Sequence, residues 1–177
     1  MATGPTSSAP RPSKSRQRVL RGSLTPEQTR IFLYLLFAMV QRIDGQRREV
    51  FGGDLDLASI LHAVSESTIE GLMRDPDWRG RHGDLSKVVG ATGQRGINTL
   101  SISQATGIPR ETARRKIKKL IAMGALTDTG RNEFILTPGY LQRVMTPQRF
   151  DKLMADTVRF FNEALAAGVY TWSDSQE

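Results

Sequence analysis

Along the first half of the chain, the order of apolar and polar residues predicts two helices. The first is expected over residues 24–44, where a helix-start signal at Thr25 and Pro26 precedes ten consecutive apolar residues, 31–40. Because this run covers every face of the helix, it should be buried, either in the core of a monomer or against a second subunit. The second helix is expected over residues 54–73, where the apolar residues form a one-sided stripe.

Three other segments lack such a pattern. Residues 1–22 are rich in Ser, Pro and basic residues and have few large apolar ones, which is typical of a disordered basic tail. Residues 76–96 contain five glycines and are expected to form a Gly-rich loop, with at most a short helix at 85–89. Residues 169–177 are expected to form a second tail.

Residues 97–141 carry the most specific pattern of the chain. A short helix is expected over 98–106, followed by a left-handed turn at Gly107 and a second helix over 109–122. A β-hairpin is expected over 125–136, with Gly and Asn in its turn. This order of elements indicates a winged helix-turn-helix. The predicted fold class is therefore mainly α with a small β-hairpin wing, flanked by N- and C-terminal helices.

An amphipathic helix is expected over residues 146–168. It opens with Thr146 and Pro147, and its apolar residues recur every three or four positions. Two interpretations of this stripe stay open. It packs on the core of its own chain, or it pairs with the 24–44 helix of a second subunit, which would make the protein a homodimer joined through helices 24–44 and 146–167.

The charge is distributed unevenly. Twenty-five Lys and Arg against 18 Asp and Glu give a formal net charge of +7. The segment from Arg110 to Lys119 contains six basic residues and one acid, Glu111, and so contributes +5. The N-terminal tail contributes another +5, so the remainder of the chain carries −3. This concentration indicates a polyanionic partner, for which nucleic acid is favoured over an anionic membrane surface.

The composition and the motifs argue against several classes of function. The chain has no cysteine and only two histidines, which excludes disulfides and Cys-based zinc sites. The segment from Gly90 to Gly96 lacks the Lys-Ser/Thr ending of a phosphate-binding loop. No apolar run approaches the roughly 20 residues that span a bilayer. We therefore expect no enzymatic activity, cofactor, metal or membrane partner, and a cytoplasmic, nucleoid-associated location.

The nine residues from Gly107 to Arg115, Gly-Ile-Pro-Arg-Glu-Thr-Ala-Arg-Arg, resemble the recognition helix of the cyclic-AMP receptor protein family of bacterial regulators. The resemblance implies that Arg110, Glu111 and Arg115 read base edges in the major groove, and that Thr112 contacts a phosphate. Nothing before residue 97 has the many short strands of a cyclic-nucleotide domain, so control by cyclic AMP is not implied. The flanking helices resemble the layout of MarR-type regulators.

Other polar residues are also expected to contact the DNA. Contacts to the DNA backbone are expected from Asn98, Thr112, Arg114, Lys116, Lys118 and Lys119. Arg131 on the wing, and Arg16 or Arg18 in the tail, are expected to enter a minor groove or to lie on the backbone.

The sequence thus predicts a sequence-specific DNA-binding transcriptional regulator that inserts the 109–122 helix into the major groove. Two alternatives stay open: a replication, partition or architectural DNA-binding protein, and a winged helix used as a protein-interaction module. A small-molecule effector, if there is one, is expected between the 24–44, 54–73 and 146–167 helices.

Overall fold

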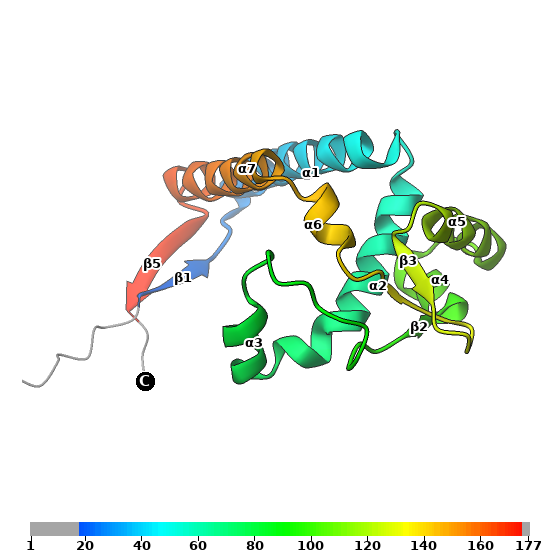
Figure 1. Cartoon of the computed structure of the whole chain (residues 1–177). Helices are drawn as coiled ribbons and strands as arrows, with labels where there is room; N and C mark the ends of the chain where they lie inside the picture. The colour runs from blue at the N-terminus through cyan, green and yellow to red at the C-terminus, as the bar shows by residue number, and fades with distance from the viewer. Residues whose placement is uncertain (1–17, 175–177) are drawn as a thin grey trace, which may run out of the picture. The chain divides into compact units, whose positions relative to one another are not determined.

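The computed structural model describes residues 18–174 (Figure 1). Over this range the chain is mainly helical and contains two small antiparallel sheets. It divides into two compact units. We call residues 37–158 the central unit, and residues 18–36 together with 159–174 the terminal unit. The division falls within α1 (Thr29–Phe51) and within α7 (Pro147–Ala166).

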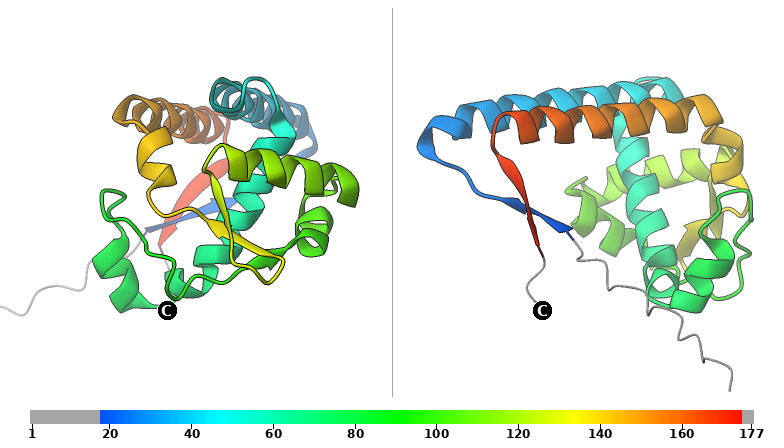
Figure 2. Two further views of the ribbon diagram at one scale, coloured as in Figure 1. Left: turned by 45° about the vertical axis from the view of Figure 1, so that its right-hand side comes forward. Right: turned by 90° about the vertical axis from the view of Figure 1, so that its left-hand side faces the viewer.

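The central unit holds five complete helices and a three-stranded sheet. The helices are α2 (Leu55–Met73), α3 (Pro76–His82), α4 (Thr99–Thr106), α5 (Arg110–Ala122) and α6 (Tyr140–Val144). The strands are antiparallel and lie in the order β2 (Ile97–Asn98), β4 (Glu133–Leu136) and β3 (Leu126–Asp128). Figure 2 shows α4, α5 and the sheet gathered around α2, which contacts each of them.

Apolar side chains of α2 form the centre of the core of this unit. Leu57, Ile60 and Val64 lie three or four residues apart, on one face of the helix, and are fully buried. Burial of each such side chain contributes about 1.5–3 kcal/mol to folding. Other members of the same cluster come from α4, α5 and the sheet and include Ile102, Ile117, Leu120, Leu126, Phe134 and Leu136.

Short-range hydrogen bonds and one glycine fix the ends of the helices in the central unit. The Leu57 amide donates to Asp54 Oδ1 at 3.4 Å and begins α2, and the Ser101 amide donates to Asn98 Oδ1 at 3.0 Å and begins α4. Gly107 ends α4 with a φ of +69°. The helices predicted at these positions coincide with α2, α4 and α5 to within one residue, and the predicted hairpin is β3 and β4.

The terminal unit is built on a two-stranded antiparallel sheet. Strand β1 (Arg18–Gly22) pairs with β5 (Tyr170–Asp174), and Arg21 Nε donates to Ser173 Oγ at 2.9 Å. The 3-10 helix η1 (Pro26–Gln28) leads into α1, and the Thr25 amide donates to Gln28 Oε1 at 3.0 Å. Phe160 of α7 is buried next to the ring of Tyr170. These contacts connect the two ends of the described chain.

The first helix is longer than the sequence indicated. We expected it to end at residue 44, because Gly45 follows, but α1 continues to Phe51. A single glycine costs a helix only about 0.5–1 kcal/mol, which is too little to end one that has favourable neighbours on both sides. The true end comes at Gly52 and Gly53, where φ is +58° and +88° in succession.

Both predicted tails contain strands. Residues 18–22 were expected to belong to a disordered tail and residues 170–174 to a second one, but they pair as β1 and β5. The hydrogen bonds that order each strand come from the other end of the chain, so neither segment carries a local signal of its own. The remaining parts of the two predicted tails, residues 1–17 and 175–177, lie outside the described residues.

The expected Gly-rich loop is also partly ordered into a helix. Asp75 accepts a hydrogen bond from the Asp77 amide at 2.9 Å, and Pro76 occupies the first position of α3. The short helix expected at 85–89 is not formed, and that segment consists of a turn, a bend and irregular chain. The five-residue helix α6 was not expected.

We predict opposite effects of alanine at two glycines. Gly107→Ala should lower the free energy of unfolding by about 1–2 kcal/mol, because a left-handed φ is unfavourable for alanine. The strain is purely one of the backbone, since no atom lies within 4 Å of the added Cβ. Gly45→Ala, in the interior of α1, should instead raise the free energy of unfolding by about 0.5–1 kcal/mol. Urea unfolding measures both changes in the free energy of unfolding. If the two changes had the same sign, the described backbone conformation at one of these glycines would be wrong.

Candidate nucleic-acid interface

The candidate site is the exposed face of α5. Ala113, Ile117 and Leu120 are buried three or four residues apart, so they fix this helix against α2 by one face. The helical period then directs the residues between them outward. The side chains on the outer face are exposed, and all but the glutamate are basic: Arg110, Glu111, Arg114, Arg115, Lys118 and Lys119.

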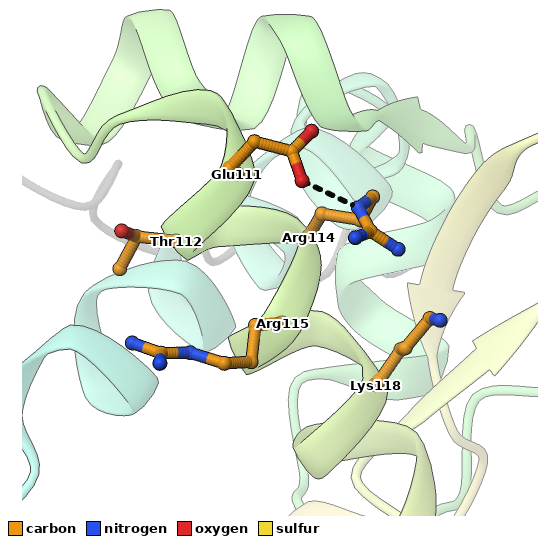
Figure 3. A pocket seen from close by; sticks show the side chains of 5 residues that line it. All are labelled: Glu111, Thr112, Arg114, Arg115 and Lys118. Carbon is orange, nitrogen blue, oxygen red and sulfur yellow. Dashed lines mark hydrogen bonds and ion pairs between the residues drawn. The ribbon is translucent and has the colours of Figure 1, made fainter.

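The middle of this face carries five of the predicted DNA contacts. Glu111, Thr112, Arg114, Arg115 and Lys118 line one open hollow on the surface of α5 (Figure 3). In this view, Thr112 and Arg115 extend to one side of the helix, and Arg114 and Lys118 extend to the other. The helix therefore presents cationic groups on both of these sides, and Glu111 extends on the same side as Arg114.

The glutamate on this face is already paired. Arg114 Nε donates to Glu111 Oε2 at 2.9 Å, while the two side chains stay 54% and 77% exposed. An exposed pair of this kind contributes at most about 1 kcal/mol, since water competes for both groups. Either side chain can therefore exchange its partner for an external one at little cost.

A groove of about 280 Å³ separates α5 from the hairpin. Its α5 side includes Arg110, Arg114 and Lys118, and its hairpin side includes Asp128 and Asn132. The hairpin turn is held by the Gly130 amide, which donates to Asp128 Oδ1 at 2.8 Å. The predicted wing residue Arg131 lies in this turn and is exposed. Arg131 therefore places one basic side chain on the hairpin, while the groove wall next to it carries the acid Asp128.

Lys116 is placed differently from our expectation. We assigned it to the DNA backbone, but its Nζ lies 2.5 Å from Asp54 Oδ2 and 3.8 Å from Asp56 Oδ2, and its side chain is only 18% exposed. This hydrogen bond from Lys116 is the main cause that lowers the pKa of Asp54. Lys116 therefore links α5 to the start of α2. Lys119 lies 3.9 Å from the same carboxylate but stays 58% exposed.

The other predicted contacts lie in three places. Thr112 is half-buried on α5. Asn98 is exposed and uses its side-chain oxygen to cap α4. Arg18 belongs to β1 of the terminal unit, where its guanidinium lies 5.8 Å from the centre of the Trp172 ring. Arg16 lies outside the described residues.

Sequence reasoning missed two contributions to the site. Asp128 and Asn132 were expected only to form a turn, and their position in the groove depends on how the hairpin folds back on α5. Asp54 is the first residue of the helix expected over 54–73, and its pairing with Lys116 bridges 62 positions of sequence. No local signal reveals a contact over such a distance.

Other kinds of site receive no support from the described part of the chain. Residues 18–174 contain no cluster of three or more His, Cys, Asp or Glu side chains that could hold a metal ion. None of the helices in this range is both long and apolar enough to cross a membrane. Comparisons with models of protein families, with curated proteins and with solved structures found no match. The chemistry of α5 itself is therefore the basis for inferring a function.

We predict a measurable coupling between Lys116 and Asp54. Asp54→Asn keeps an oxygen for the helix cap but removes the charge, and Lys116→Met removes the other partner. A double-mutant cycle at pH 7 should give a coupling of about 0.5–1 kcal/mol. Because the pKa of Asp54 is lowered in the folded state, this stabilisation should persist above the ordinary aspartate pKa of about 3.9 and disappear as the pH falls through the lowered value.

The exposed pair of Glu111 and Arg114 provides the control for this cycle. Its coupling should be smaller than that of Lys116 and Asp54, because more than half of each side chain is exposed to water. A Lys116–Asp54 coupling of zero at pH 7 would mean that this pair does not connect α5 to α2.

Proposed function

We propose that this protein is a sequence-specific DNA-binding transcriptional regulator, with α4, α5 and the β3–β4 hairpin forming a winged helix-turn-helix. The observation that carries the proposal is the composition of α5. One face is apolar and buried, and the opposite face presents five exposed cationic side chains, Arg110, Arg114, Arg115, Lys118 and Lys119. A major groove about 12 Å wide admits such a helix, and its phosphates attract such a face.

The exposed residues divide into two kinds of contact. Arg110, Glu111 and Arg115 lie in the first half of α5, where side chains of an inserted recognition helix reach base edges. Arginine offers two parallel donors to guanine, and glutamate accepts from the amino group of cytosine. Thr112, Arg114, Lys118 and Lys119 would contact phosphates, and Arg131 would contact the DNA beside the major groove. Lys116 has no place in this interface, because it is paired with Asp54.

We further infer that two copies of the chain associate through α1 and α7. The apolar run 31–40 buries Leu35, yet Tyr34 is 70% exposed and Phe37 is 60% exposed. On α7, Met154 is 64% exposed. Large apolar side chains exposed on neighbouring turns mark an interaction surface. A second copy fits best, because a two-fold dimer presents two recognition helices to a palindromic site.

Selection of bound sequences from random duplex DNA tests the proposed function. The selected duplexes are then measured again at two salt concentrations. We expect a palindromic motif with half-sites about 10 bp apart. Steeply salt-dependent binding without a motif would indicate an architectural, replication or partition role instead. The absence of any binding would indicate a protein-interaction module.

Two substitutions on α5 should affect DNA binding differently. Arg115→Ala should weaken binding at the selected site by about 1–3 kcal/mol and relax the base preference there. Lys118→Ala should weaken binding to all sequences about equally and reduce the salt slope by about one. Arg81→Ala removes an exposed basic residue of α3, away from α5 and from the inferred dimer helices, and should change neither quantity. Unchanged affinity and base preference in Arg115→Ala would show that α5 does not read the sequence.

The dimer is tested by a charge placed on α7. Met154→Glu should raise the dimer dissociation constant at least about tenfold, because a buried unpaired carboxylate opposes association. Gln148→Glu adds the same charge to another face of the same helix and should leave the constant unchanged. Sedimentation equilibrium measures both. A wild-type protein that is monomeric at every accessible concentration would contradict the inferred dimer.

A further inference from the structure

The two-stranded sheet of the terminal unit takes no part in the proposed DNA interface. It consists of β1 and β5, and no further strand pairs with either of them among residues 18–174 (Figure 1). The open edge of a strand presents unpaired amide and carbonyl groups, which are a template for pairing with another strand. A sheet of only two strands is also marginally stable in water. Both properties make this sheet a candidate surface for a partner strand.

The base of the sheet is fixed within the terminal unit. Val169, just before β5, is 2% exposed, and its carbonyl accepts a hydrogen bond from the Ser23 amide at 3.2 Å. At the start of β5, the ring of Tyr170 lies against that of the buried Phe160, with 6.4 Å between the ring centres. A partner would therefore meet a preformed strand, which reduces the entropy lost on binding.

The hydrogen bond at the base also defines which groups of β5 point to its open edge. In the register of the sheet, Ser23 is the residue opposite Val169, so this pair is a hydrogen-bonded one. Such pairs alternate with non-hydrogen-bonded pairs in an antiparallel sheet. Thr171 therefore bonds to β1, whereas the amide and carbonyl of Trp172, at the centre of β5, point away from β1 to the open edge.

The two edges of the sheet differ in chemistry. β1 carries Arg18 and Arg21, which are both exposed, and charged side chains on an edge strand oppose pairing. Pairing of two copies through β1 would bring two arginines from each copy together. Residues 170–173 of β5, Tyr-Thr-Trp-Ser, include neither a charge nor a proline, and Tyr, Thr and Trp are favoured in strands. β5 is therefore the edge that is open to pairing.

The edge of β5 is complementary to itself. When two identical strands pair antiparallel across a two-fold axis, one residue lies opposite itself, because opposite residues of a sheet share a face. If this residue is Trp172, its outward backbone groups bond to those of the partner, and its indole, 52% exposed in the single chain, faces the partner's Trp172. Thr171 then faces the partner's Ser173, and hydroxyl side chains opposite each other can form a hydrogen bond.

Exposed apolar side chains connect this edge to the surface inferred for the dimer. Phe161 of α7 is 38% exposed, and its ring centre lies 6.0 Å from that of Tyr170. Tyr170 in turn lies on the same face of the sheet as Trp172, because the two residues are two positions apart on one strand. The edge of β5 therefore continues the apolar surface of α7, on which the inferred dimer depends.

We propose that β5 pairs antiparallel with β5 of a second copy, centred on Trp172, so that the two sheets join into one sheet in the order β1-β5-β5-β1. This proposal rests on the dimer inferred with the proposed function, because a few strand hydrogen bonds alone would hold two copies only weakly. Within the dimer, the arginines of β1 lie on the two outer edges of the joined sheet. The basic face of α5 is not involved.

Cross-linking of single cysteines tests the pairing on the full-length protein, which has no cysteine of its own. Trp172→Cys places the thiol opposite itself, with about 5.5 Å between the Cα atoms. Leu20→Cys is the matched control, because Leu20 pairs with Trp172 within the chain but lies three strand spacings, roughly 14 Å, from the same residue of the other copy. A short bismaleimide should link Trp172→Cys at least about tenfold faster than Leu20→Cys. Equal rates would overturn the proposal.

A charge swap tests the same register without a cross-linker. Trp172→Lys and Trp172→Glu each place like charges opposite each other and remove an aromatic pair, so each should raise the dimer dissociation constant about three- to tenfold. A one-to-one mixture of the two variants should associate more tightly than either alone, because opposite charges then face each other. Sedimentation equilibrium measures association, and circular dichroism verifies that both variants are folded. A mixture no tighter than the separate variants would overturn the pairing.

The outcomes distinguish this proposal from the proposed function. A wild-type protein that is monomeric at every accessible concentration would overturn both the helical dimer and the β5 pairing. A dimer in which the cross-linking and the charge swap both fail would overturn the β5 pairing alone. If the variants at Trp172 weakened DNA binding but left association unchanged, the sheet would contact DNA instead of a second copy, and the pairing would be wrong.

Discussion

The apolar contact between α2 and α5 determines where every charge on α5 lies. Ile117 and Leu120 of α5 are buried in the same cluster as Leu57 and Ile60 of α2. Removal of one such side chain would cost about 2–5 kcal/mol, more than any single surface charge contributes. The rotation of α5 about its own axis is therefore set by its apolar stripe. The orientation of the helix therefore fixes where its basic side chains lie. Those opposite the apolar stripe extend outward, and Lys116, at the edge of the stripe, pairs with Asp54.

That arrangement has an electrostatic cost in the free protein. Basic residues recur four positions apart on α5, as Arg110 and Arg114, Arg114 and Lys118, and Arg115 and Lys119. Each such pair destabilises a helix by about 0.2–0.5 kcal/mol, and Glu111 relieves only one of the cations. Core packing outweighs this repulsion. A polyanion would remove it, which is why the same face that weakens the isolated helix supports the proposed association with DNA.

Features that depend on neighbouring residues could be predicted from sequence, and those that depend on distant ones could not. Asn98, Gly107 and the period of α5 are local signals, and the helices around them agree with prediction to within one residue. The pairing of β1 with β5 joins the two ends of the chain, so neither segment revealed it. Lys116 is an intermediate case. Its position one helical turn from the buried Ala113 and Leu120 was visible in the sequence, but its partner was not.

Titration of the protein with duplex DNA would map the surface that contacts DNA and so test directly whether α5 is the DNA-binding element. Backbone amide signals of the isotopically labelled protein would be followed by nuclear magnetic resonance as a selected duplex is added. We expect the largest changes on residues 110–119 of α5 and on the hairpin turn at 129–132, with little change on the buried face of α2. Changes concentrated elsewhere, with α5 unaffected, would contradict the assignment of this helix as the DNA-binding element.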